Sequence, residues 1–155
     1  MKFKVALFIS AVAFVSGSTL AMVASPILSP SKGTEEQESI VDIIDGDTLQ
    51  IAAPWSPYGL EWKVRVRGID APEKGARAKC SPEKSRAARA EKMTEQLISQ
   101  SDNQVILRNV DHDKYGGRLV ADVILKDGSS LSEELISAKL AKRYNGSGPR
   151  PTWCF

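Results

Sequence analysis

The middle of the chain alternates between apolar and polar side chains with a period of two. In the segment 61–69, a tryptophan and two valines fall on one face, and a lysine and two arginines fall on the other. Such alternation predicts a strand with one buried face. Two runs rich in β-branched and apolar residues, 39–45 and 48–52, precede this strand, and the Asp-Gly pair between them predicts a hairpin.

One helical pattern separates these strands from two more, and a second helical pattern follows the last strand. Ser81 as an N-cap, followed by Pro82 at the first helical position, predicts a helix with an apolar stripe. The segments 104–110 and 119–125 have the composition of strands, and a capping-box pattern at 130–133 predicts a short second helix.

This order predicts an α+β protein, mostly β with helices, built on a five-stranded OB-type barrel. One helix lies between the third and fourth strands and a short helix follows the fifth, which is the order of elements in OB barrels. We expect the domain to span residues 39–144, with a tail rich in Gly and Pro at 145–155. OB barrels commonly bind oligonucleotides, but a fold alone does not determine a function.

The first 24 residues have the pattern of a secretory signal peptide. Lys2 and Lys4 precede an apolar stretch that gives way to small residues ending at Ala24. We therefore predict export, either periplasmic or secreted, with residues 25–38 as a flexible leader. The alternative is an uncleaved anchor that holds the protein in the membrane, facing outside the cytoplasm, because the apolar character persists long enough to span a bilayer.

Export changes how the two cysteines, Cys80 and Cys154, are interpreted. An even pair in an oxidising compartment predicts a disulfide, which would tie the C-terminal tail to the middle of the chain. Two cysteines alone cannot form a closed structural zinc site. The alternative is a pair of free thiols.

The composition excludes two classes of protein. The 155 residues are 42% hydrophobic and 26% charged, which rules out a disordered tail protein and a multi-span membrane protein. Without Lys2 and Lys4, the 21 basic residues fall to 19, equal to the 19 acidic residues, so net charge gives no argument for nucleic acid. The distribution does, because acids concentrate at 35–50 and bases at 63–92, which suits phosphate contact with a cation between.

Three short segments place charged residues at the ends of predicted strands. They are Asp45-Gly46-Asp47-Thr48, the stretch from Arg65 to Asp70-Ala71-Pro72-Glu73, and Asp113-Lys114-Tyr115-Gly116-Gly117-Arg118. Each segment alone is compatible with an ordinary turn. Their joint occurrence in this order indicates a functional site.

With these three segments, residues 39–144 resemble the staphylococcal nuclease family. The resemblance implies an OB barrel, in agreement with the order of elements. It also implies an enzyme that cleaves DNA, RNA or both with Ca²⁺ and little sequence preference. No stable protein partner is implied, and we expect a monomer whose contact with a membrane depends on whether the N-terminal segment is cleaved.

The metal ligands implied by the resemblance are Asp47, Asp70 and the backbone carbonyl of Ala71. Asp45 matches an acid that lies beside the metal without binding it. Ca²⁺ takes about 6–8 oxygen ligands, so three protein oxygens leave several positions to water and substrate. We therefore expect weak metal binding by the protein alone and cooperative binding of metal and substrate.

The remaining roles implied by the resemblance concern phosphate and water. Arg65 and Arg118 match two phosphate-binding arginines, and a planar guanidinium suits phosphate because it donates two charge-assisted hydrogen bonds. Glu73 matches the carboxylate that orders or deprotonates the attacking water, and we expect mainly the ordering role. Lys114 and Tyr115 are candidate substrate contacts, Tyr115 by stacking on a base or by touching phosphate.

Two features depart from the family pattern. The family usually has Tyr-Gly-Arg where this chain has a second glycine, Gly117, before Arg118. We assign the phosphate role to Arg118 because the apolar run that follows it fits this register. The family's long C-terminal helix also has no counterpart, and we expect a disulfide to Cys80 to hold that end instead.

A non-catalytic OB-type nucleic-acid binding module is the alternative function. Such a module could lose Asp47, Asp70 or Glu73 freely, whereas this sequence retains all three beside its arginines. The sequence therefore favours the enzyme.

Overall fold

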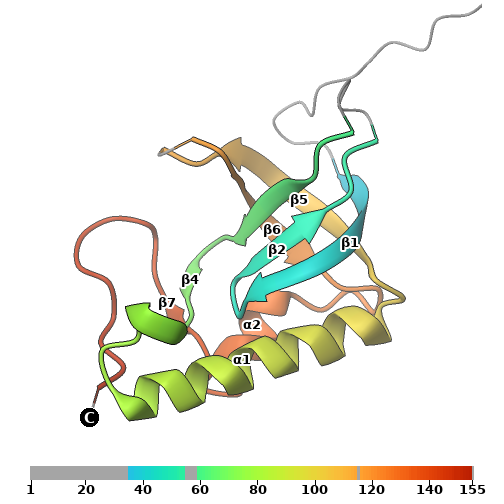
Figure 1. Ribbon diagram of the computed structural model, residues 1–155. Helices are drawn as coiled ribbons and strands as arrows, with labels where there is room; N and C mark the ends of the chain where they lie inside the picture. Colours follow the sequence, from blue (N-terminus) through green and yellow to red (C-terminus); the bar gives the residue numbers. More distant parts are fainter. Residues whose placement is uncertain (1–34, 55–58, 115, 155) are drawn as a thin grey trace, which may run out of the picture.

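The barrel of the computed structural model, which describes residues 35–54, 59–114 and 116–154, is closed by five strands (Figure 1). The strands are β1 (Glu36–Asp45), β2 (Thr48–Ile51), β3 (Trp62–Val66), β5 (Gln104–His112) and β6 (Leu119–Ile124). Their order around the barrel is β1-β2-β3-β6-β5, and β5 pairs with β1 to close it. All pairs are antiparallel except the parallel pair of β3 and β6. The predicted α+β barrel is confirmed.

Two helices accompany the barrel. Helix α1 (Ser81–Gln100) runs beneath it between the third and fourth barrel strands, and the short α2 (Leu131–Ser137) follows the fifth (Figure 1). A single 3₁₀ turn, η1 (Gly75–Arg77), precedes α1. None of the helices in the described ranges is both long and apolar enough to cross a membrane. The predicted signal peptide and most of the predicted leader lie outside those ranges.

The strands of the structure differ from the predicted ones in three ways. Strand β1 begins at Glu36 rather than at Ser39, because Glu36 to Ser39 pair with β5. The predicted strand 61–69 is divided at Gly68, whose φ of +80° turns the chain. Beyond that turn, β4 (Ile69–Asp70) pairs with β7 (Lys142–Arg143), a strand that the sequence did not predict.

The predicted helix caps are wrong in detail. The N-cap of α1 is Cys80 and Ser81 is the first helical residue, so no serine side chain caps the helix. The carboxylate of Glu83 instead reaches back and accepts a hydrogen bond from the backbone N–H of Lys79 at 2.7 Å. Ser130 does precede α2, but its hydroxyl lies 2.8 Å from that of Ser132 and caps no backbone N–H, so the capping box does not form.

One continuous hydrophobic core fills the barrel and extends to both helices. The strands contribute alternate side chains such as Leu49, Val64 and Leu107, each at most 1% exposed, and α2 contributes Leu135. Burial of a side chain of this size stabilises the fold by about 1.5–3 kcal/mol. The core makes the barrel a rigid support for the loops at its rim.

The turn between β1 and β2 packs directly on α1 through Gly46. A Cβ atom at this position would lie 2.7 Å from the Cβ of Ala90 and 3.2 Å from that of Ala71. The hydroxyl of Thr94 donates a hydrogen bond to the carbonyl of Gly46 at 2.9 Å. The helix therefore fixes the position of the turn that carries Asp47.

This contact predicts that Gly46→Ala lowers the free energy of unfolding by about 1–3 kcal/mol, because the added methyl group overpacks the turn. Urea denaturation measures the change. Ala90→Gly removes the opposing methyl group, so the double variant should lose less stability than the two single variants together. Strictly additive losses would contradict the proposed clash.

Candidate functional site

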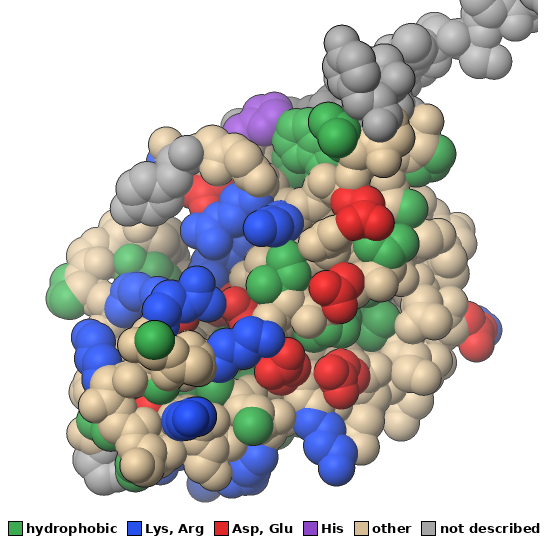
Figure 2. Space-filling view, viewed as in Figure 1, with side chains coloured by type: hydrophobic (Ala, Val, Ile, Leu, Met, Phe, Trp, Pro, Cys, Tyr) green, Lys and Arg blue, Asp and Glu red, His purple; other side chains and the backbone are tan. Residues whose placement is uncertain are grey.

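A cavity of about 1000 Å³ opens at the rim of the barrel and gathers most of the charged residues singled out in the sequence. Its walls come from the β1–β2 turn, the β3–β4 segment, the β5–β6 hairpin and the C-terminal tail. The predicted site residues among its lining are Asp45, Asp47, Arg65, Ala71, Glu73, Lys114 and Arg118. Figure 2 shows Lys and Arg side chains gathered on this face, with Asp and Glu side chains beside them.

Asp47 lies at the base of the cavity and is only 2% exposed. Its Oδ1 accepts hydrogen bonds from Arg65 Nη1 at 2.8 Å and from the hydroxyl of Thr48 at 3.1 Å. Its Oδ2 accepts one from the backbone N–H of Ala71 at 2.7 Å. Asp45 Oδ1 accepts a hydrogen bond from the backbone N–H of Asp47 at 3.2 Å, which holds Asp45 next to Asp47.

Arg65 joins the two predicted metal-binding carboxylates. Besides its bond to Asp47, its Nη2 donates to Asp70 Oδ1 at 3.3 Å and to the carbonyl of Ile69 at 3.2 Å. The register of the barrel produces this arrangement, because Arg65 lies opposite Thr48 in the β2–β3 pair. Asp70, also 2% exposed, follows on β4. The two carboxylates therefore lie beside one guanidinium.

Burial has the largest effect on the protonation of Asp47. Burial raises the pKa of Asp47 to about 7, against the opposing effect of the Arg65 guanidinium, and the neighbouring Asp45 raises it further. In the protein without metal, Asp47 thus takes up a proton near neutral pH.

Glu73 is held by two arginines that the sequence reasoning missed. Its Oε2 forms an ion pair with Arg77 Nε at 2.7 Å, and its Oε1 accepts a hydrogen bond from Arg150 Nη1. Arg150 also donates to Asp70 Oδ1 through Nε at 2.7 Å. Partial burial opposes the charged form of Arg150, but the bonds to Asp70 and Glu73 outweigh it and raise the pKa of Arg150 above its usual value.

A sequence signal for Arg150 existed. It is the one charged residue between 145 and 155, the segment that the predicted disulfide ties to the middle of the chain. Arg77 follows Glu73 by four residues, within the basic stretch 63–92. Neither position belongs to the three motifs that predicted the site.

The β5–β6 hairpin brings Arg118 to the same cavity despite the additional glycine. Gly116 and Gly117 both have positive φ, +73° and +74°, so the turn accommodates the extra residue and Arg118 begins the wall formed by β6. Arg118 Nε forms an ion pair with Asp113 of its own hairpin. Lys114 Nζ donates to the carbonyl of Gly146 in the tail at 2.7 Å, and Tyr115 lies outside the described residues.

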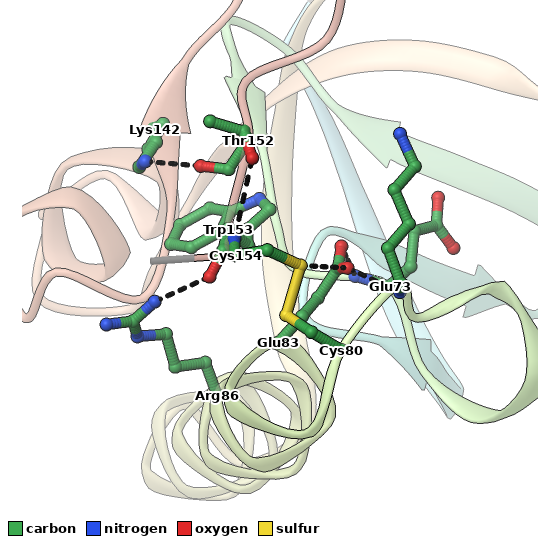
Figure 3. Close-up of a disulfide and its surroundings, with 9 residues drawn as sticks. Glu73, Cys80, Glu83, Arg86, Lys142, Thr152, Trp153 and Cys154 are labelled. Carbon is green, nitrogen blue, oxygen red and sulfur yellow. Dashed lines mark hydrogen bonds between the residues drawn. A yellow bond between two sulfur atoms is a disulfide. The ribbon is translucent and has the colours of Figure 1, made fainter.

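The predicted disulfide between Cys80 and Cys154 is present. It joins the C-terminal tail to the residue that caps α1, and Figure 3 shows the carboxylate of Glu83 beside it. Cys154 Sγ lies 3.7 Å from Glu83 Oε2. Although these three side chains are close enough to surround an ion, two sulfur atoms bonded to each other offer no thiolate, so they form no metal site.

The chemistry of Asp47 and Asp70 suits a hard divalent cation. Both offer carboxylate oxygens, the ligand type that Ca²⁺ and Mg²⁺ prefer, and both are directed at a shared positive charge. Their fixed hydrogen bonds hold the oxygens in place before any ion binds. The residues present therefore fit a metal of this class.

Comparison with known families identifies the family of the chain. A family model described as staphylococcal nuclease homologue matches residues 63–152. The chain belongs to the staphylococcal nuclease family. No curated protein matches the chain. The match contains Arg65, Asp70, Glu73, Arg118 and Arg150, and the hydrogen bond between Arg65 and Asp47 connects it to the β1–β2 turn.

Membership gives the site a general chemistry. Staphylococcal nuclease homologues are in general metal-dependent nucleases on a fold that binds nucleic acid, and a nucleic-acid substrate follows from that family. The carboxylates at the cavity are compatible with metal binding, and its guanidinium groups are compatible with binding of nucleic-acid phosphates.

The raised pKa of Asp47 predicts how stability depends on pH without metal. The folded protein binds the proton of Asp47 more tightly than the unfolded chain, whose Asp pKa is 3.8. The contribution of this proton to the free energy of unfolding is therefore full below about pH 4 and is lost as pH rises through about 7. Asp47→Asn cannot titrate. Between pH 4.5 and pH 8 the wild type should lose about 3 kcal/mol of unfolding free energy relative to this variant.

Urea denaturation of both proteins with EGTA present measures this difference. Asp127→Asn is a suitable control, because Asp127 is exposed and lies outside the cavity, and its pKa is lowered rather than raised. Parallel pH profiles for the wild type and Asp47→Asn would contradict the assignment.

Proposed function

We propose that this protein is an exported, Ca²⁺-dependent nuclease that hydrolyses phosphodiester bonds of DNA, RNA or both with little sequence specificity. The observation that supports it most directly is that Arg65, in a cavity also lined by Asp47, Glu73 and Arg118, donates hydrogen bonds to both Asp47 and Asp70. Two metal-binding carboxylates, a third carboxylate and two guanidinium groups are the functional groups that metal-assisted phosphodiester hydrolysis requires.

Arg65 and Arg118 are the phosphate-binding groups in this proposal. Arg65 lies on β3 and Arg118 directly precedes β6, and both line the same cavity. Arg65 balances the two aspartates in the protein without metal. When those aspartates hold a cation, the guanidinium of Arg65 becomes available to the phosphate. There it stabilises the negative charge that grows in the transition state.

Asp47 and Asp70 would hold the cation, with the carbonyl of Ala71 as the third protein ligand. Bound there, Ca²⁺ supplies a Lewis acid for the phosphate and positions water. Glu73 accepts a proton or a hydrogen bond from that water, and its two oxygens are oriented by Arg77 and Arg150. Lys114 and Tyr115 remain candidate contacts for the substrate.

The disulfide supports export. Disulfides persist in oxidising compartments and are rare in the cytosol, and all described cysteines of this chain are paired. The apolar N-terminal segment supports the same compartment. We therefore propose a periplasmic or secreted protein, with a membrane anchor facing outside the cytoplasm as the alternative, and we propose that it acts as a monomer.

Removal of metal tests the proposal directly. Purified protein should cleave single- and double-stranded DNA and RNA with Ca²⁺, and EGTA should abolish cleavage until Ca²⁺ is restored. Gel analysis of fluorescent oligonucleotides measures both. Hydrolysis that persists in EGTA would remove the metal from the mechanism, and binding of the oligonucleotides without cleavage in any metal would support a binding module instead.

Conservative substitutions test the residue roles. Glu73→Gln should lower kcat by about 10²–10⁴-fold, because the amide cannot accept the proton of the attacking water. Arg65→Lys should lower it by about 10²–10³-fold, because an ammonium lacks the planar fork. Steady-state cleavage of a DNA oligonucleotide measures both values.

The exposed ion pair of Glu133 and Arg143 offers matched controls outside the cavity. Glu133→Gln and Arg143→Lys repeat the same chemical changes and should leave kcat unchanged. Equal kcat values for the Glu73 variant and its control would contradict the proposed role of Glu73, and the same comparison applies to Arg65.

A further inference from the structure

The C-terminal tail is fastened at both ends beside the candidate site. At its start, β7 pairs with β4, and the backbone N–H of Tyr144 donates to the carbonyl of Gly68 at 2.9 Å. At its end, Cys154 is bonded to Cys80. In Figure 1 this segment loops away from β7 and returns to the start of α1.

The final residues of the tail are packed as well as tethered. Trp153 is 4% exposed, and the ammonium of Lys142 lies 4.6 Å from the centre of its ring. The carbonyl of Trp153 accepts a hydrogen bond from Arg86 Nη1 of α1 at 2.8 Å, and Lys142 Nζ donates to the carbonyl of Thr152 at 2.7 Å (Figure 3). These contacts define the path of the chain on the C-terminal side of Arg150.

Arg150 lies between these fastened ends and bridges two carboxylates of the site. Its Nε donates to Asp70 Oδ1 at 2.7 Å, and its Nη1 donates to Glu73 Oε1. The other oxygen of Glu73 forms an ion pair with Arg77. Each oxygen of Glu73 therefore has its own guanidinium, and Arg150 fixes the orientation of Glu73 relative to Asp70.

The disulfide region also touches the backbone of Glu73. Glu83, 4% exposed, accepts a hydrogen bond from the backbone N–H of Glu73 at 3.3 Å through Oε1. Its other oxygen lies 3.7 Å from the sulfur of Cys154 (Figure 3). The disulfide is thus adjacent to the Glu83 carboxylate, which contacts the backbone of Glu73, and it lies four residues after Arg150 in the tail.

We propose that Arg150 is a positioning residue of this site, which orients Glu73 against Asp70, and that the Cys80–Cys154 disulfide keeps it there. The inference rests on the proposed nuclease function. It adds a positioning arginine to the site and makes turnover depend on the oxidation state of a bond that lies outside the cavity.

Arg150 also shares Asp70 with any cation that binds there. A guanidinium that donates to Asp70 Oδ1 competes with a metal for the same carboxylate. Removal of Arg150 should therefore have two opposite effects. The metal should bind the protein more tightly in the absence of substrate, whereas turnover should fall because Glu73 loses its orientation. A merely structural role would not produce this combination.

The test compares wild type with Arg150→Ala and Arg150→Lys. Arg150→Ala should lower kcat by about 10–100-fold, the usual cost of losing a residue that orients a catalytic group, with a smaller change in KM. It should also lower the Kd for Ca²⁺, measured by calorimetry without nucleic acid, several-fold. Arg150→Lys keeps the charge but cannot bridge both carboxylates, so its kcat should lie between those of the wild type and Arg150→Ala. Arg143→Ala is the control for loss of an arginine beside the tail.

The disulfide is tested with the double variant Cys80→Ser/Cys154→Ser, compared at a temperature where urea denaturation shows it folded. Its kcat should match that of Arg150→Ala, and Arg150→Ala added to it should cause little further loss, because both changes remove the same contact. Independent losses that multiply, or a wild-type kcat for Arg150→Ala, would overturn the inference.

The two proposals fail in different ways. A wild type that cleaves no nucleic acid with Ca²⁺ overturns the nuclease function. If the wild type cleaves and Arg150→Ala has the same kcat and the same Kd for Ca²⁺, only the role of Arg150 is overturned. A wild type that neither cleaves nor binds Ca²⁺ overturns both.

Discussion

The guanidinium of Arg65 joins two buried carboxylates, and the candidate site is organised around that contact. Asp47 and Asp70 are each 2% exposed, and a buried charge without a partner costs several kcal/mol. Arg65 supplies the partner for both from the adjacent strand. Because side chains alternate along a strand, a slip of one residue in the β2–β3 register would turn Arg65 to the other face and remove the guanidinium that the two aspartates share. The register of the barrel strands therefore determines the geometry of the site.

The sequence was sufficient for the parts of the molecule whose signals are local. Alternation at 61–66 and the Asp-Gly turn before Asp47 located β3 and the β1–β2 hairpin, because each depends on neighbouring residues. The order of strands and helices then indicated the OB barrel. The motifs around Asp47, Asp70 and Arg118 were recognised through their resemblance to a family. Asp47 and Arg118 line one cavity, and Asp70 contacts Arg65 of the same lining.

The parts that were missed depend on contacts between distant residues. Strand β7 has only two residues and no periodic pattern, and it exists because β4 offers unpaired backbone groups. Arg150 is separated from Asp70 by 80 residues along the chain, so no local pattern connects them. The Ser81 cap was predicted from a local rule, but the structure starts the helix one residue earlier, after the disulfide-bonded Cys80. In each case a tertiary contact decided the local structure.

The tail shows how a disulfide can act locally as well as globally. Cys80 and Cys154 are 74 residues apart, and closing a loop of this length stabilises the whole fold by about 4 kcal/mol in the chain-entropy account. That contribution does not by itself order the tail. Ordering each residue costs about 1–2 kcal/mol, and Gly146 and Gly148 add freedom to the segment before Arg150. With both ends of the segment fixed, the guanidinium of Arg150 is held close to Asp70 and Glu73, so that its effective concentration there is high. A free end would have to supply that order from Trp153 and a few hydrogen bonds alone. The covalent bond therefore affects the site chiefly through the short tail it closes.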